Sequence, residues 1–279
     1  MNYYDIIREG QLNACVEPGR VLAALPGFPV GRSEVYKRFP PQYDLLCLRQ
    51  DRNLGNIASV VGEVLREAAS PGDVRQLVVA DIGTGTGKLA DMIEKWGAHV
   101  IGFDRARPML NYCHDTVHRA TDVIQAMNAH IPLRNKSVDV AIAGWTLSET
   151  KSAHFDTEWR QHIDDSLAEV TRISRRAVLI MENLSVGQDA PARSGSHFYK
   201  YLVENAGFTR CWKRTDYVFD SVEEAIQLTR FFFGTKRASL WESSLRAQET
   251  EDSTDMETQE KHDKGIVLPE CTGFFWKTL

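Results

Sequence analysis

The chain has 279 residues, of which 43% are hydrophobic, and its formal net charge is -5. A chain of this size can bury a full core, and its negative charge argues against nucleic acid as a partner. The five cysteines lie far apart without a C-x-x-C pair, which argues against a metal site and a disulfide framework. No signal peptide or apolar run of membrane length is visible, so we expect a soluble, cytoplasmic protein without a membrane partner.

Residues 1–50 precede the predicted core as an N-terminal extension. Half of the ten prolines fall between residues 17 and 41, together with three glycines, which predicts a loop-rich segment laid over another part of the molecule. Residues 57–65 then carry apolar side chains at helical spacing. They predict a helix that ends at the Ser-Pro-Gly-Asp turn of residues 70–73.

Residues 77–90, LVVADIGTGTGKLA, are the most informative stretch of the chain. Four apolar residues predict a strand buried on both faces, and apolar residues at helical spacing resume after residue 88. Between them lie Asp81 and three glycines at alternate positions, Gly83, Gly85 and Gly87. Glycine costs conformational entropy, so this pattern indicates a tight turn whose backbone closely approaches a ligand.

Three ligand classes use a strand, a glycine turn and a helix. A phosphate-binding P-loop would need a glycine at Ile82 and a hydroxyl at Leu89, so this class is excluded. The dinucleotide pattern G-x-G-x-x-G fits only in its variant that ends in alanine, from Gly85 to Ala90. A nicotinamide-dependent oxidoreductase therefore stays open as an alternative.

The pattern acid-x-Gly-x-Gly-x-Gly resembles the class I S-adenosylmethionine (SAM) methyltransferases. The resemblance implies that the turn, with Thr84 among its residues, packs under the amino-acid end of SAM, and that Asp81 contacts the SAM amino group. An anion suits that ammonium group, whereas it would repel the pyrophosphate of a dinucleotide.

The next segments extend the resemblance. Residues 99–103 predict a strand that ends at Asp104, where a carboxylate accepts the ribose hydroxyls in both nucleotide classes. In the loop that follows, Arg105 and Met109 occupy positions that border the adenine in the family. Residues 127–133 resemble the family's xDAxxLP segment after a short strand at 123–126, with Asn128 in place of the common Asp. Asn128 would accept from the adenine amine, and Ala129 would donate its backbone N–H to the ring.

Candidates for the acceptor side follow the strand predicted at residues 138–144. The resemblance implies that the next loop borders the transferable methyl group, where Trp145 would lie near the sulfonium. Glu149 and His154 are the nearest side chains that can take a proton, so they are the candidate catalytic bases. Tyr36 and Tyr43 in the N-terminal extension are candidates for a lid over the acceptor. Tyr43 opens a segment that resembles the helix preceding the core in small-molecule methyltransferases.

The rest of the chain continues the alternation of helices and strands. We expect helices at 159–174, 197–205 and 222–233, and strands at 177–181 and 208–219. Residues 247–265 are strongly charged and predict a mobile acidic loop before a final strand at 266–276. The fold class is α/β, a doubly wound, mostly parallel seven-stranded sheet with helices on both faces. The resemblance implies that its final strand, at the edge, is antiparallel.

The expected function is methyl transfer from SAM to an unidentified small-molecule acceptor by a domain spanning residues 51–279. Two alternatives stay open beside it. One is an NAD(P)-dependent oxidoreductase, and the other is a SAM-binding subunit without chemistry of its own. The acceptor atom and the oligomeric state do not follow from the sequence.

Overall fold

The computed structural model describes residues 18–26, 30–117, 122–153, 159–192, 197–254 and 265–279. Seven strands form one sheet in the order β3-β2-β1-β4-β5-β9-β6. Their bounds are β1 Val78–Ile82, β2 His99–Asp104, β3 Asp122–Gln125, β4 Val138–Gly144, β5 Ser174–Val186, β6 Thr209–Arg214 and β9 Glu270–Thr278. The first five in chain order pair in parallel, while β9 is antiparallel to both β5 and β6. The predicted mostly parallel seven-stranded sheet with an antiparallel final strand is confirmed, but β9 lies inside the sheet and β6 forms the edge.

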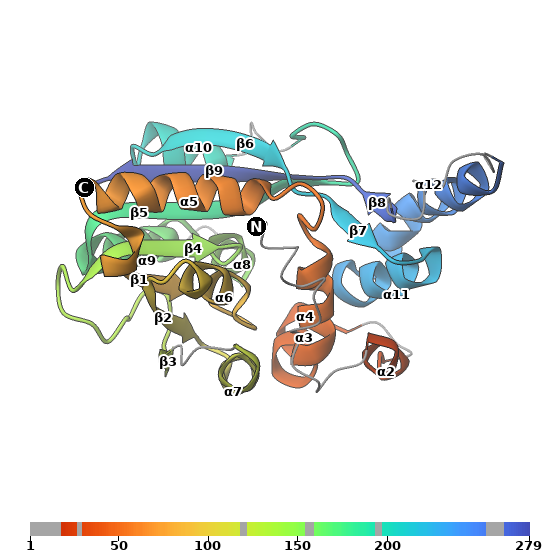
Figure 1. Ribbon diagram of the computed structural model, residues 1–279, viewed down its shortest axis with the longest axis horizontal. Helices are drawn as coiled ribbons and strands as arrows, with labels where there is room; N and C mark the ends of the chain where they lie inside the picture. Colours follow the sequence, from red (N-terminus) through yellow and green to blue (C-terminus); the bar gives the residue numbers. More distant parts are fainter. Residues whose placement is uncertain (1–17, 27–29, 118–121, 154–158, 193–196, 255–264) are drawn as a thin grey trace.

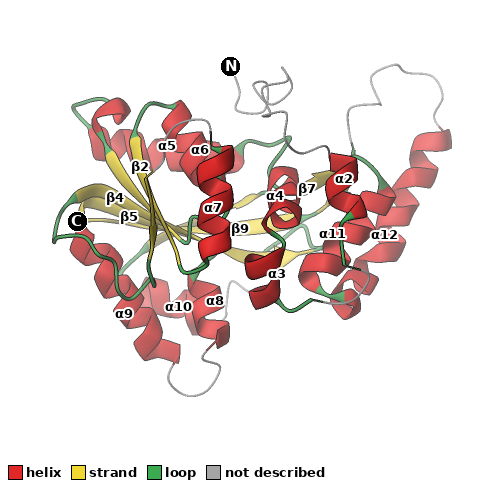
Figure 2. Cartoon of the chain, turned by 90° about the horizontal axis from the view of Figure 1, so that it is seen from below, coloured by secondary structure: helices red, strands yellow, loops and turns green. Residues whose placement is uncertain are grey.

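Helices cover both faces of this sheet (Figure 2). On one face, α5 (Asn56–Ala69) and α6 (Lys88–Lys95) bury the apolar stripes that the sequence predicted. On the other, α9 (Trp159–Ile173) and α10 (His197–Glu204) pack against β4, β5 and β9. The short helices α7 (Arg107–Thr116) and α8 (Leu147–Ala153) follow β2 and β4. The two cores between these layers fix the sheet, so the loops at the carboxyl ends of its strands have a firm base.

A second group of elements lies beyond those carboxyl ends and is called the cap here (Figure 1). It consists of α2 (Pro18–Ala23), α3 (Arg32–Arg38), α4 (Pro40–Arg49), α11 (Val222–Phe233), α12 (Thr235–Thr254) and a two-stranded sheet of β7 (Tyr217–Phe219) with β8 (Ile266–Leu268). All of these elements except α3 contribute to a separate hydrophobic core, in which Leu45 and Leu46 pack with Phe219, Leu228 and Leu245. The cap therefore combines residues 18–49 of the N-terminal segment with residues 217–268 from the later part of the chain.

The helices of the N-terminal segment differ from the predicted loops. The sequence predicted a loop-rich segment between residues 17 and 41. The structure instead has helices over residues 18–23, 32–38 and 40–49. Pro18 and Pro40 each occupy the first residue of a helix, where the missing N–H costs nothing because that donor has no partner within the helix. These prolines therefore start helices.

Two predicted strands are each broken in the structure. The segment 208–219 divides into β6 and β7, and the segment 266–276 divides into β8 and β9, so that β7 pairs with β8 outside the main sheet. Buried hydrogen bonds stabilise the chain where the strands are interrupted. The hydroxyls of Thr215 and Thr272 lie 2.6 Å apart, and the Glu270 N–H donates to the Asp216 carboxylate at 3.0 Å. The chain thus leaves the main sheet for the cap at Asp216 and returns to it at Glu270.

Helix α12 occupies part of the predicted acidic loop. The loop was expected at 247–265, but the helix continues to Thr254, and residues 255–264 lie outside the described residues. The Gln248 side chain donates to the Val267 carbonyl at 2.9 Å and accepts from the Val267 N–H at 2.8 Å. Together with the buried side chain of Leu245, these contacts fix the helix onto β8. Composition alone did not predict the helical continuation, because it is stabilised by tertiary contacts with β8.

Candidate active site

Two adjoining pockets lie where the carboxyl ends of β1, β2 and β4 face the cap. The larger has a volume of about 570 Å³ and the smaller about 130 Å³. Their shared lining includes the glycine turn, the loop after β4 and the cap helices α3 and α4. The residues common to both are Tyr36, Tyr43, Gly83, Gly85, Arg105, Gly144, Trp145 and Glu149. In open α/β sheets this end of the strands is where ligands bind.

Asp81 lies at the end of β1 and lines the larger pocket with 1% of its surface exposed. Its Oδ2 accepts the Thr84 hydroxyl at 2.7 Å, while its Oδ1 is buried without a hydrogen-bond partner in the described structure. Burial raises the pKa of this carboxyl group to about 7. A buried oxygen without a partner costs stability, so the site is suited to a ligand that brings a donor.

The three glycines of the turn do different things. Gly83, Gly85 and Gly87 all have positive φ, as the predicted tight turn requires. A Cβ at Gly83 would lie 2.5 Å from the Thr146 hydroxyl, and one at Gly87 would lie 2.7 Å from the sulfur of Cys113. Gly83 and Gly85 line both pockets, whereas Gly87 lines neither and lets α7 pack closely. The sequence had grouped Gly87 with the ligand-contacting residues, but its immediate neighbours are protein side chains.

The smaller pocket gathers the residues predicted around a nucleoside. Asp104, Met109, Asn128 and Ala129 all line it, although they come from β2, α7 and the loop after β3. Asp104 accepts backbone N–H groups of Gly85 at 3.0 Å and Ala106 at 2.7 Å, and burial raises the pKa of its carboxyl group. Asn128 donates to the Thr146 hydroxyl at 3.1 Å. These bonds fix the directions of both polar side chains.

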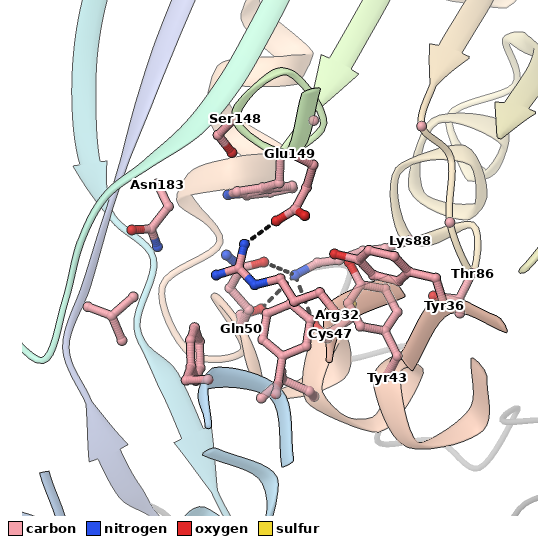
Figure 3. Close-up of a pocket in the computed structure, with 18 of the residues that line it drawn as sticks. Arg32, Tyr36, Tyr43, Cys47, Gln50, Thr86, Lys88, Ser148, Glu149 and Asn183 are labelled. Atoms are coloured by element: carbon pink, nitrogen blue, oxygen red, sulfur yellow. Dashed lines mark hydrogen bonds and ion pairs between the residues drawn. The ribbon is translucent and has the colours of Figure 1, made fainter. Parts of the chain in front are cut away.

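Trp145 follows β4 with a φ of 52°, and its ring faces a lysine. The Lys88 ammonium lies 5.9 Å from the ring centroid and donates to the Cys47 carbonyl, the Gln50 carbonyl and the Gln50 amide oxygen at 2.9, 3.1 and 2.9 Å. Figure 3 shows these bonds converging on Lys88. Burial lowers the pKa of Lys88. The sequence identified Lys88 only as a failed P-loop lysine, yet it ties the end of α4 to the turn.

The wall of the larger pocket away from the sheet is aromatic and comes from the cap. Tyr36 and Tyr43 meet edge to face with centroids 5.4 Å apart, and Tyr43 lies 5.4 Å from Phe232. Phe232 and Phe233 are partly buried and pack against the hydrophobic core of the cap. Further residues that sequence reasoning did not single out also line this pocket: Gln50, Asn183, Tyr199, Tyr217, Trp241 and Glu270. No local motif marks them, because they reach the pocket through tertiary packing.

The two candidate bases have different outcomes. Glu149, near the start of α8, lines both pockets and forms an ion pair with Arg32 at the start of α3. Figure 3 shows Arg32 reaching across the pocket to this carboxylate. His154 lies outside the described residues. Glu149 is therefore the candidate base that the structure brings to the other site residues.

Comparison with known protein families bears on the choice between SAM and a nicotinamide cofactor. Residues 80–177, from β1 into β5, match a family model described as a methyltransferase domain. Residues 80–177 of the chain therefore form a methyltransferase domain. This domain implies SAM as the cofactor, which favours the methyltransferase expectation over the nicotinamide alternative. No curated protein matches the chain.

Solved structures similar to this methyltransferase chain are remote in sequence. A SAM-dependent methyltransferase from Aquifex aeolicus is 18% identical, with 70% of this chain and 90% of that chain covered and a TM-score of 0.41. A candidate methyltransferase from an antibiotic biosynthesis pathway of Anabaena variabilis is 15% identical, with 78% and 96% covered and a TM-score of 0.48. The [4+2]-cyclase SpnF is 14% identical, with 90% and 98% covered and a TM-score of 0.49.

Among the described residues, no group of three or more His, Cys, Asp or Glu side chains is arranged to hold a metal ion. Within the same residues, none of the helices combines the length and apolar character that crossing a membrane needs.

Proposed function

We propose that the protein transfers the methyl group of SAM to a small-molecule acceptor bound in the larger pocket under the cap. The observation that carries the proposal is the buried Oδ1 of Asp81, which has no hydrogen-bond partner in the described structure and belongs to a residue that lines this pocket. An ammonium group would supply the missing donor and the opposite charge. The residues present therefore suit the amino-acid end of SAM.

The proposed cofactor position follows the shape of the two pockets. The adenosine occupies the smaller pocket, with its ribose at Asp104 and its adenine beside Met109, Asn128 and Ala129. Because the Asn128 amide nitrogen donates to Thr146, its oxygen is the atom that accepts from the adenine amine. The methionine part crosses the turn at Gly83 and Gly85 toward Asp81.

The acceptor is proposed to be small because of the size of its pocket. A volume of about 570 Å³ lies within the range of about 300–1,000 Å³ that is usual for small-molecule sites. The side chains of α3, α4, α11 and α12 form the wall of this pocket opposite the sheet. Exclusion of water and fixed orientation of the acceptor are then the main contributions of these residues, and positioning alone supplies up to roughly 7–11 kcal/mol.

The chemistry of the step is a displacement. Bound SAM supplies a methyl group on a sulfonium: the S–CH₃ bond breaks with its electron pair on sulfur, while a lone pair of the acceptor forms the new bond to carbon. A neutral hydroxyl or amine acceptor must also lose a proton, and Glu149 is the described carboxylate placed to receive it. An acceptor that is already anionic needs no base.

Two measurements test the proposal in sequence. Calorimetry with S-adenosylhomocysteine and with NADH should show binding of the first and none of the second. The protein is then incubated with methyl-labelled SAM and with separate small-molecule, RNA and protein fractions of a cell extract. Label in the small-molecule fraction is the expected result. Label in RNA or protein contradicts the proposed acceptor class, and cofactor binding without any transfer supports a SAM-binding subunit.

A further inference from the structure

Arg32 in the larger pocket uses few of its hydrogen-bond donors. Within the described structure its guanidinium has one hydrogen-bond acceptor, Glu149, although a guanidinium carries five N–H donors. The Arg32 side chain keeps 39% of its surface exposed. Lys88, in contrast, gives its donors to three oxygens of Cys47 and Gln50. Arg32 therefore has N–H groups available to a ligand.

The surroundings of Arg32 combine charge with a flat apolar wall. Its guanidinium carbon lies 5.4 Å from the Phe232 ring centroid. The Phe232 ring contacts Tyr43, which in turn contacts Tyr36. Stacking on a ring orients a guanidinium and leaves the edge with its N–H groups free for a planar anion. The pocket thus offers an aromatic face beside a fork of donors that matches a carboxylate.

The charges that line the larger pocket also favour a ligand with a carboxylate. Four basic side chains face three acidic ones: Arg32, Lys88, Arg105 and Arg237 against Asp81, Glu149 and Glu270. Burial raises the pKa of Glu270 to about 8 and lowers the pKa of Lys88, so one acid and one base both lose charge and the excess of basic side chains remains. Bound SAM adds the charge of its sulfonium. The loaded pocket is therefore net positive and attracts an anionic acceptor.

We propose that the acceptor is a planar aromatic or conjugated carboxylic acid, whose carboxylate replaces Glu149 on Arg32 and whose ring packs on Tyr36, Tyr43 and Phe232. The inference rests on the proposed function and names its substrate class. Glu149 holds Arg32 in position in the empty pocket and is released when the acceptor binds. A carboxylate freed in this way lies beside the bound acceptor.

The test uses benzoate, with benzamide as its neutral analogue of the same shape. Both are titrated into protein saturated with S-adenosylhomocysteine, and binding is followed by ligand-observed NMR. Benzoate should bind about tenfold more tightly than benzamide, as expected for a hydrogen-bonded charge pair. Arg32→Gln should abolish the preference, and Glu149→Gln should strengthen benzoate binding because it removes the competing anion. Arg38→Gln, on the same helix with 62% of the Arg38 side chain exposed, is the matched control and should change nothing.

Three results would overturn the inference. One is equal affinity for benzoate and benzamide in both the parent protein and Glu149→Gln. Another is a loss of benzoate binding in Arg38→Gln that matches the loss in Arg32→Gln. The third is a loss of S-adenosylhomocysteine affinity in Arg32→Gln, which would assign Arg32 to the cofactor carboxylate. A parent protein that does not bind S-adenosylhomocysteine at all would refute the proposed function itself, so the two failures are distinguishable.

Discussion

Asp81 concentrates two unfavourable features in a single side chain. It is buried, and one of its oxygens lacks a partner in the described structure, which costs about 1–3 kcal/mol in proteins generally. Burial also raises the pKa of the carboxyl group to about 7, so a substantial fraction is protonated at neutral pH. Both costs are relieved when an ammonium group binds, because the cation favours the ionised form.

Asp81→Asn should therefore weaken S-adenosylhomocysteine binding by about tenfold to a hundredfold, the worth of a charged hydrogen bond. In the parent protein the affinity should rise between about pH 6 and 8, because the carboxylate that binds the amine forms as the pH passes the raised pKa. Calorimetry at several pH values measures both effects. Asp115→Asn, at an exposed position, is the control, and a pH-independent affinity would contradict the role of Asp81.

Single residues were predictable where a local motif carries them. Asp81 and Asp104 lie at the ends of strands β1 and β2, and Gly83 follows β1 directly, so the spacing along the chain indicated that they would meet at one edge of the sheet. Arg32 and Glu270 line the same pocket but come from the two ends of the sequence. Their positions depend on how the cap packs, which short-range patterns do not encode.

At the scale of elements, the glycine turn allows a direct test. Gly83→Ala would place a Cβ 2.5 Å from the Thr146 hydroxyl at a φ of 74°. We expect a loss of about 1–3 kcal/mol in the free energy of unfolding and weaker S-adenosylhomocysteine binding, because the turn must shift. Urea denaturation and calorimetry measure the two effects. Gly19→Ala, in helix α2 with no atom within 4 Å of the added Cβ, should leave both values close to those of the parent.

Helix α12 and strand β8 form the second test at this scale. Gln248→Ala removes both side-chain bonds to the Val267 backbone, so β8 should lose about 1 kcal/mol of local stability. Hydrogen exchange at Val267 should quicken accordingly. Gln161→Ala, which removes an exposed contact on α9, should not alter exchange in β8. Unchanged protection of Val267 in Gln248→Ala would show that α12 is not held through this contact.

Elements with continuous apolar patterns were predicted well, including β1, β4, α5 and α9. The errors fall where polar tertiary contacts interrupt a strand or extend a helix. Thr215 and Asp216 divide a predicted strand because buried hydrogen bonds to Thr272 and Glu270 redirect the chain. Such contacts join residues far apart in the sequence, so neither strand signals the break by itself.

Across the whole molecule, buried acids make stability depend on pH. Burial raises the pKa of Glu182 and of Asp81 to about 7, and that of Glu270 to about 8. A carboxyl group whose pKa is raised on folding binds its proton more tightly in the folded state. Its contribution is therefore full at low pH and is lost as the pH rises through the raised value. The ligand-free protein should lose stability between about pH 5 and 8.

Glu182→Gln isolates one of these acids away from the pocket lining. Glu182 is fully buried, and its Oε1 accepts the Ser148 N–H at 3.0 Å, a bond that the amide oxygen can keep. The variant should gain about 1–3 kcal/mol over the parent at pH 8, and the gain should shrink toward pH 5. Thermal melts across this range measure the difference. The exposed Glu67→Gln serves as the control, and a gain independent of pH would exclude titration of Glu182 as its cause.

The cap's construction from both ends of the chain sets an order of assembly during synthesis. Strands β1 and β2 and the turn between them leave the ribosome early, so the nucleoside half of the crevice can form on a nascent chain. The aromatic wall cannot form until Phe232 has been synthesised and can contact Tyr43. Likewise, β7 cannot pair until β8, which follows it in the chain, has been synthesised. Contacts between such distant segments form late because long loops must close first. A truncated chain would thus bind the cofactor before its acceptor pocket has formed.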